Sequence, residues 1–159
     1  MTEVVGELFD EVGRANLLLV TTNASIKRSG QIVMGRGAAK QAAERWPELP
    51  SRIVQAAQEA DHISSTGFRW YGLVLTDIYE KGTRVGAFQV KEEWWQRANL
   101  SIIQLSATML RGIAVSQSLE FKRVAMNFPG IGNGGRTREE VLPLLADLPR
   151  HVFVYRRPE

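Results

Sequence analysis

Short apolar runs of β-strand character alternate with longer segments of helical periodicity along this sequence. Strands are predicted at residues 16–20, 68–75, 85–90, 123–128 and 151–155. Helices are predicted at residues 35–46, 51–60 and 92–112, and from Thr137 to about Asp147. This alternation predicts an α/β fold in which helices cover both faces of a mixed sheet. In such sheets, ligands bind at the carboxyl ends of the strands.

Three local signals support the predicted helices. Pro47 is expected to end the first helix, because proline cannot continue a helical backbone. In the third helix, Ala98, Ile102, Leu105 and Met109 are spaced by four, three and four residues, which places them on one face. A threonine and a glutamate three residues later, at 137 and 140, form a capping box that predicts the start of the last helix.

Length and composition narrow the classes of protein that this chain can represent. Its 159 residues are expected to form one domain, spanning residues 1–159. There is no cysteine, so disulfides, thiolate zinc sites and cysteine nucleophiles are excluded. The two histidines, His62 and His151, are far apart, so neither a metal centre nor a cofactor is expected. The acidic N-terminal segment does not resemble a signal peptide, and the longest aliphatic run, LLLV, is too short to span a membrane. We therefore expect a cytoplasmic protein without a membrane partner.

The net charge of +3 and the isoelectric point near 9.5 are compatible with an anionic ligand, including nucleic acid. The basic pairs at residues 27–28, 122–123 and 156–157 are scattered along the sequence. Scattered pairs favour a solvated surface over a nucleic-acid groove.

The segment PGIGNGGRTREE, residues 129–140, places four glycines in six positions between a predicted strand and a predicted helix. Gly130, Gly132 and Gly135 match the spacing of the dinucleotide fingerprint, but that motif needs an acidic residue about 20 positions later. Tyr155 occupies that position, so a Rossmann site is excluded. A tight structural turn needs one or two glycines. Four favour a loop whose backbone amides approach an anion, next to the positive end of the helix that begins near Thr137.

A second glycine-containing loop follows the strand at residues 16–20. Thr21, Thr22 and Asn23 end this strand, and Gly35, Arg36 and Gly37 open the next helix. No G-K-[ST] sequence follows, so this is not a Walker A loop. Two strand–loop–helix units of this kind in one small domain predict that two helix ends hold a diphosphate, as in a nucleotide diphosphate sugar.

Four segments, in this order, resemble the macrodomain family: VTTNA, VMGRGAAKQAAERWPEL, GAFQVKEEWWQRANLSII and MNFPGIGNGGRTREEVLPLL. The likeness covers residues 3–155 and is closest to the branch of bacterial antitoxin-type hydrolases that remove ADP-ribose from nucleobases. It implies a three-layer α/β/α sandwich with a mixed central sheet and an ADP-ribose cleft at the carboxyl edge of the sheet. The segment between Asn23 and Met34 is longer than in those hydrolases. Ile32 replaces a common family glycine, which is expected to change the wall beside the distal ribose.

The resemblance also implies roles for individual residues. Asn23 corresponds to the asparagine that contacts the distal ribose, and Lys91 to the lysine that the nucleobase-hydrolase branch uses there, so both are candidate catalytic residues. Glu7 corresponds to the acid that reads the adenine amino group. Trp94 is expected to pack against other side chains, whereas Trp95 can either pack or contact the ligand. The complete set of expected ligand-binding residues is Glu7, Leu8, Thr22, Asn23, Val33, Met34, Gly35, Arg36, Gly37, Pro129, Gly130, Ile131, Gly132, Asn133, Gly134, Gly135 and Tyr155.

Three functions are compatible with such a cleft. The first is hydrolysis of an ADP-ribosyl link, with ADP-ribose or an ADP-ribosylated substrate as partner and nucleic acid as one candidate target. The second is a non-catalytic reader of ADP-ribose. The third is hydrolysis of ADP-ribose 1″-phosphate. The sequence does not distinguish among them, because each attached group ends on the same sugar.

Overall fold

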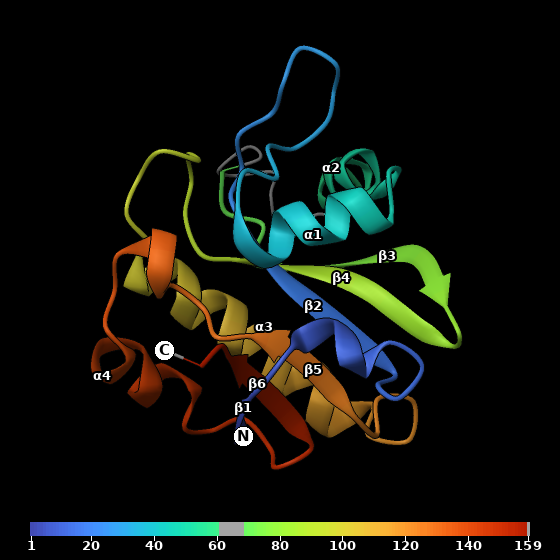
Figure 1. Ribbon diagram of the computed structural model, residues 1–159, viewed down its shortest axis with the longest axis vertical. Helices are drawn as coiled ribbons and strands as arrows, with labels where there is room; N and C mark the ends of the chain where they lie inside the picture. The colour runs from blue at the N-terminus through green and yellow to red at the C-terminus, as the bar shows by residue number, and fades with distance from the viewer. Residues whose placement is uncertain (61–68, 159) are drawn as a thin grey trace.

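The computed structural model describes residues 1–60 and 69–158 and confirms the three-layer α/β/α architecture (Figure 1). The central sheet has the strand order β1-β6-β5-β2-β4-β3. All neighbouring strands are parallel except β3 and β4, so the sheet is mixed, as predicted. The strands are β1 (Thr2–Val5), β2 (Leu17–Thr22), β3 (Leu73–Glu80), β4 (Thr83–Gln89), β5 (Val124–Asn127) and β6 (Val152–Arg156).

Helices cover both faces of the sheet. Figure 1 shows α1 and α2 on one side and α3 and α4 on the other. None of the helices in residues 1–60 and 69–158 has the length and hydropathy needed to cross a membrane. The helical elements are η1 (Leu8–Glu11), α1 (Gly37–Arg45), α2 (Leu49–Glu59), α3 (Leu100–Ser116), η3 (Gly132–Gly134), α4 (Arg138–Val141) and η4 (Leu142–Leu145), where η marks a 3₁₀ helix.

Strand β2 lies at the centre of the sheet and is buried on both faces. Leu18 and Val20 pack in the cluster that includes α1 and α2, whereas Leu17 and Leu19 pack in the cluster that includes α3. All four side chains are 0% exposed. Full burial of such a side chain contributes roughly 1.5–3 kcal/mol, so β2 anchors both layers of helices to the sheet.

One strand was not predicted, and two predicted elements begin later than expected. Strand β1 was not predicted, because it is a short edge strand with no alternating apolar pattern. The strand predicted at residues 68–75 begins at Leu73, and residue 68 lies outside the described residues. The helix predicted from residue 92 begins at Leu100, because the side-chain oxygen of Asn99 accepts hydrogen bonds from the amides of Ser101 and Ile102. Such an N-cap sets the first turn of a helix.

The last predicted helix is shorter than expected. The capping box is confirmed, because Thr137 accepts from the amide of Glu140 and Glu140 accepts from the amide of Thr137. The α-helix nevertheless ends at Val141 instead of extending to Asp147. Pro143 has no amide to donate to the carbonyl four residues earlier, so the chain continues as the 3₁₀ helix η4.

Glu11 is a fully buried carboxylate that links η1 to the C-terminal half of the sheet. Its oxygens accept hydrogen bonds from Nε and Nη2 of Arg123 at 2.7 and 2.8 Å, and from the hydroxyl of Tyr155. The Arg123 hydrogen bond holds the pKa of Glu11 below its ordinary value of 4.5, although burial opposes this shift. Tyr155 belongs to β6, so the ion pair and this hydrogen bond together connect three segments that are distant in the sequence.

We predict that Glu11→Gln lowers the free energy of unfolding by about 3 kcal/mol at pH 7. This is the lower end of the range for a broken buried ion pair, because Arg123 keeps 28% of its side chain exposed. The folded pKa of Glu11 is depressed, so its contribution is present above pH 4.5 and is lost as the pH falls through the folded pKa. Urea unfolding at several pH values should therefore show the difference shrinking in acid. Glu44→Gln, at an exposed position of α1, is the control and should behave as wild type.

Candidate functional site

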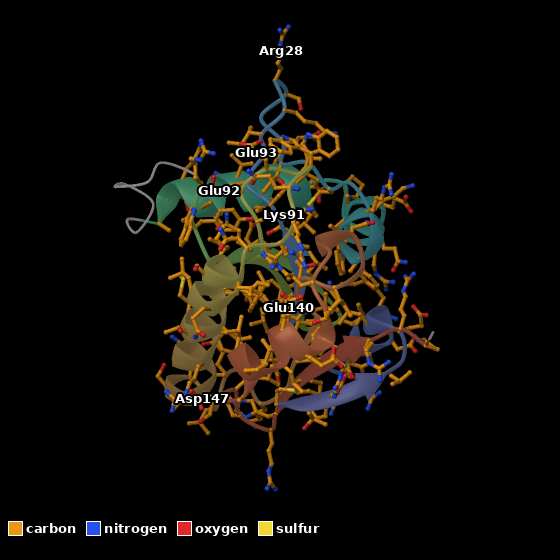
Figure 2. The ribbon with its side chains drawn as sticks, turned by 90° about the vertical axis from the view of Figure 1, so that its left-hand side faces the viewer. Arg28, Lys91, Glu92, Glu93, Glu140 and Asp147 are labelled. Carbon is orange, nitrogen blue, oxygen red and sulfur yellow. The ribbon has the colours of Figure 1, made fainter. Side chains whose placement is uncertain are left out.

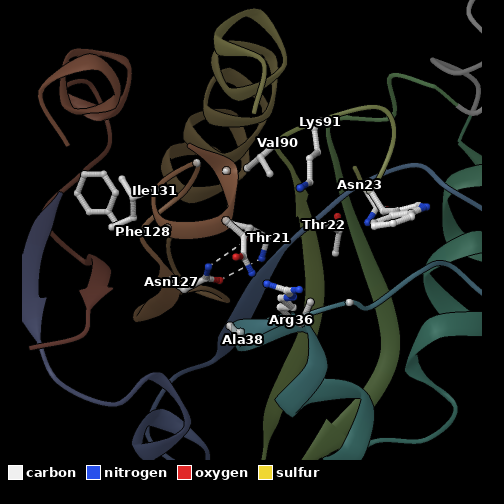
Figure 3. Close-up of a pocket in the computed structure, with 18 of the residues that line it drawn as sticks. Thr21, Thr22, Asn23, Arg36, Ala38, Val90, Lys91, Asn127, Phe128 and Ile131 are labelled. Carbon is white, nitrogen blue, oxygen red and sulfur yellow. Dashed lines mark hydrogen bonds between the residues drawn. The ribbon is translucent and has the colours of Figure 1, made fainter. Parts of the chain in front are cut away.

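A cavity of about 960 Å³ opens at the carboxyl edge of the sheet, where the parallel strands β2, β4, β5 and β6 end (Figure 3). This volume is within the range of small-molecule sites. The cavity is lined by Thr21, Thr22, Asn23, Val33, Gly35, Arg36, Gly37, Ala38, Ala39, Val90, Lys91, Trp94, Trp95, Gln96, Asn127, Phe128, Gly130, Ile131, Gly132, Asn133, Gly134, Tyr155, Arg156 and Arg157.

Side-chain hydrogen bonds connect the carboxyl ends of β2 and β5 beside the cavity. The amide oxygen of Asn127, at the end of β5, accepts from the backbone amide of Thr21 at 3.0 Å. The Asn127 side-chain nitrogen donates to the Thr21 hydroxyl at 2.8 Å, as Figure 3 shows. These bonds extend the pairing of β2 and β5 beyond the register of the strands, so they fix the spacing of the two loops that follow.

The first loop brings the N-terminus of α1 to the cavity. Gly37, Ala38 and Ala39 form the first turn and line the cavity, and no side chain caps this helix end. The first amides of a helix have no partner within it, so they can bind an anion. Arg36 precedes the helix, and Figure 3 shows its guanidinium in the middle of the cavity. Among the described residues, its side chain makes no hydrogen bond or ion pair.

The glycines of the second loop have different roles. Gly130 has φ +79°, and a Cβ atom there would lie 2.8 Å from Cδ1 of Ile103, so packing and conformation both require glycine. Gly134 lies against Ala98, where an added Cβ would come within 3.1 Å. Gly132 also has a positive φ, of +66°, but a Cβ there would meet nothing within 4 Å. The loop is therefore both a packed turn and an open backbone surface, and Gly132 belongs to the open part.

The helix that follows this loop does not reach the cavity. Neither Thr137 nor any residue of α4 lines it, and α4 has only four residues. The expectation that the positive end of this helix faces the anion was wrong. The short 3₁₀ turn η3, at Gly132–Gly134, occupies that position instead.

Asn23 directly follows the last residue of β2 and is held in one orientation. Its side-chain nitrogen donates to the carbonyl oxygen of Val33 at 3.0 Å, and its side-chain oxygen accepts from the amide of Ser25 at 2.9 Å. A primary amide has two N–H groups and two lone pairs, so one of each remains. Asn23 lines the cavity, and the remaining pair can contact two adjacent hydroxyl groups.

Lys91 follows β4 and reaches into the cavity near Asn23. Figure 3 shows its amino group pointing inward beside Val90 and Thr22. Burial lowers the pKa of this amine below its ordinary value of 10.5, because desolvation disfavours the charged form. No carboxylate of the described residues forms an ion pair with it. The structure therefore brings together Lys91 and Asn23, the two candidate catalytic residues.

Trp94 and Trp95 lie at the same end and are exposed. Their exposed fractions are 57% and 66%, so the expectation that Trp94 packs was wrong. Both line the cavity. The neighbouring residues 26–30 are exposed and project from the molecule, with Arg28 near the tip (Figure 2). Ile32, which follows them, is buried at 1% exposed and does not line the cavity, so it does not alter the wall as expected.

The charge of the cavity lining is entirely positive in the described residues. Four cationic side chains contribute, and no aspartate or glutamate lines it. The described part of the chain also contains no cluster of three histidine, cysteine or acidic side chains that could hold a metal ion; His62 lies outside it. The cations are Arg36, Lys91, Arg156 and Arg157.

Most of the expected binding residues line the cavity, but five do not: Glu7, Leu8, Met34, Pro129 and Gly135. Leu8 and Met34 are buried in the core, and Glu7 is 59% exposed and lies 3.9 Å from a guanidinium nitrogen of Arg157. Several lining residues at or just after strand ends were not predicted, among them Asn127, Phe128 and Arg157. Their position at the carboxyl ends of strands was the signal that would have identified them.

Comparison with solved structures shows the macrodomain fold. No protein-family model and no curated protein matches the sequence. The macrodomain of Thermus aquaticus DarG superposes with a TM-score of 0.72 at 21% identity, covering 99% of this chain and 97% of that chain. Thermosipho africanus DarTG, solved in complex with ADP-ribose, gives 0.72 at 21% identity and covers 98% of this chain and 41% of that chain. The macrodomain of Mycobacterium tuberculosis DarG gives 0.65 at 24% identity, covering 99% of this chain and 97% of that chain.

We predict that the Lys91 amine titrates below its ordinary pKa of 10.5, because burial disfavours its charged form. Methylating the lysines with a ¹³C label and following the Lys91 resonance by NMR against pH would measure this shift. Lys91→Arg removes one resonance and so assigns it. If the Lys91 signal titrates at the ordinary value, the amine is solvated and the burial argument does not hold.

Proposed function

We propose that the protein binds ADP-ribose in this cavity and hydrolyses an ADP-ribosyl link at the end occupied by Lys91. The observation that supports this most strongly is the order of groups along the sheet edge. Lys91 and Asn23 follow β4 and β2, and the open glycine loop follows β5. The amine of Lys91 and the amide of Asn23 suit a ribose. The backbone amides of the glycine loop suit the diphosphate that follows it.

The diphosphate would lie between the two loops. The N-terminus of α1 supplies amides from one side, and the backbone around Gly132 supplies the other. Arg36 adds a guanidinium in the middle, and an arginine can bind phosphate oxygens with two parallel hydrogen bonds. With no carboxylate in the described lining, nothing there repels the two phosphate charges.

Hydrolysis would break the bond between C1″ of the distal ribose and the attached group. The oxygen of a water molecule bonds to C1″, one water proton is released, and the leaving group takes a proton. Glycosidases divide this work between two carboxylates, but none lines this cavity in the described residues. Lys91 is the titratable group at that position. Its lowered pKa favours the neutral amine, which can accept the proton that the water releases, and the ammonium so formed can stabilise the departing anion.

The group attached to ADP-ribose would leave the cavity past the two exposed indoles. Trp94 and Trp95 present flat apolar surfaces at the Lys91 end. Indole surfaces of this kind stack on planar rings, so they favour a nucleobase as the attached group. This observation favours an ADP-ribosylated nucleic acid over ADP-ribose 1″-phosphate, whose small anion would not use them.

We predict that ADP-ribose binds with a dissociation constant of about 1 μM or lower, equivalent to roughly −8 kcal/mol. Gly35→Glu should abolish binding, because it places a carboxylate in the cavity where the phosphates would lie. Gly35 is the better test position than Gly132: a Cβ atom there meets nothing within 4 Å and its φ is not positive. Calorimetry measures both proteins, and Gly35→Ala is the control for backbone and volume. Absence of ADP-ribose binding by folded wild type would refute the proposal.

We predict that Lys91→Ala lowers turnover on the best substrate by about a hundredfold, which corresponds to about 3 kcal/mol of barrier. ADP-ribose affinity should change little, because an interaction confined to the transition state does not contribute to ground-state binding. Released ADP-ribose is measured with ADP-ribosylated DNA, RNA, protein and the 1″-phosphate as substrates. Lys27→Ala, on the projecting segment, is the control.

Two outcomes would change the proposal. If wild type releases ADP-ribose from none of these substrates but binds it, the protein is a non-catalytic reader. If Lys91→Ala retains full turnover, hydrolysis does not use this lysine.

A further inference from the structure

Arg157 lines the cavity at the end opposite Lys91. Lys91 follows β4 and Arg157 follows β6, and the strand order places β2 and β5 between them. Three strand spacings separate the two positions by about 14 Å. With the distal ribose at Lys91 and the diphosphate at the loops after β2 and β5, the adenosine lies at the end of β6. This orientation rests on the proposed function.

The cavity has more positive charge at this end than ADP-ribose can use. The diphosphate carries both negative charges of ADP-ribose, and adenine and its ribose are neutral. The guanidinium of Arg156 is already bound to Glu3, with Nε at 3.0 Å from the carboxylate. Arg157 is 59% exposed and its described partner is Glu7, whose carboxylate is 3.9 Å away and equally exposed. An exposed pair at this distance contributes little, so Arg157 remains available to an anion.

The position of Glu7 strengthens this argument. The sequence led us to expect that this carboxylate reads the adenine amino group. In the structure, Glu7 does not line the cavity and lies beside Arg157 instead. The charged group that lines the cavity here is therefore a guanidinium and not a carboxylate, and a guanidinium donates hydrogen bonds and accepts none. It suits an anionic group better than the nucleoside itself.

We propose that Arg157 forms a subsite for a phosphate on the adenosine ribose, so that the cavity selects adenine nucleotides with an additional phosphate at this end. The 5′ oxygen of that ribose carries the diphosphate, which leaves the 2′ and 3′ hydroxyls as the points of attachment. A guanidinium fork matches two phosphate oxygens. The preferred ligand class is then a ribose-phosphorylated form of ADP-ribose, or a substrate that carries it.

Calorimetry with defined nucleotides tests this subsite. Adenosine 2′,5′-bisphosphate and adenosine 3′,5′-bisphosphate are compared with AMP, and ADP-ribose 2′-phosphate is compared with ADP-ribose. We expect at least one bisphosphate to bind about tenfold more tightly than AMP, and the better isomer identifies the hydroxyl. The preference should decrease as ionic strength rises, because the arginine is exposed.

Two arginine variants show whether Arg157 is responsible. Arg157→Gln should remove the preference of the protein for the bisphosphate over AMP. Arg14→Gln should keep the preference: Arg14 is 62% exposed and 4.0 Å from Glu11, which matches Arg157 in exposure and in distance to a carboxylate, but it does not line the cavity. Both positions are exposed, so both variants should fold.

The possible failures are distinguishable. If ADP-ribose binds but neither bisphosphate exceeds AMP, the subsite is refuted and the proposed function stands. If the preference persists in Arg157→Gln, Arg157 does not form the subsite. If wild type binds no ADP-ribose, the proposed function and the subsite are refuted together.

Discussion

The rest of the structure depends on the burial of β2 between two strands and two layers of helices. Its residues 17–20 are completely buried, and it pairs in parallel with β4 on one side and β5 on the other. Because both faces and both edges are occupied, β2 has no freedom to slip in register. Thr22 is the last residue of β2 and Asn23 follows it. The polar residues of the site therefore begin directly after the strand whose register is fixed by burial.

The loops around the cavity support one another through backbone hydrogen bonds. The amide of Ala24, after β2, donates to the carbonyl of Glu92 at 2.7 Å. The amide of Ala98 donates to the carbonyl of Gly134 at 2.8 Å, which joins the segment after β4 to the glycine loop after β5. Lys91 directly precedes Glu92, the first of these two points. The segment that follows the lysine is therefore held by two loops from other parts of the sequence, without an ion pair between the amine and a described carboxylate.

The arginines of this protein divide into structural and available ones. Arg123 and Arg138 bind Glu11 and Glu3 through two hydrogen bonds each, and Arg156 shares Glu3. The contacts of Arg138 and Arg156 with Glu3 hold the N-terminal strand to α4 and β6, and they lower the pKa of Glu3 to about 2. The net charge of the chain therefore does not predict how many cations can bind a ligand. Among the described residues of the lining, the cations without a strong carboxylate partner are Lys91, Arg36 and Arg157.

The sequence by itself determined the α/β alternation, the mixed sheet and the loops that border the site, because these depend on local periodicity, strand-end position and glycine content. It also determined the capping box at Thr137, whose partners are three residues apart. Tertiary structure decided the exposure of Trp94, the contact of Glu7 with Arg157, and the partly buried setting of Lys91. Each of these follows from which distant segments lie side by side. Burial and desolvation arise from such neighbours, and the pattern of one segment carries no information about them.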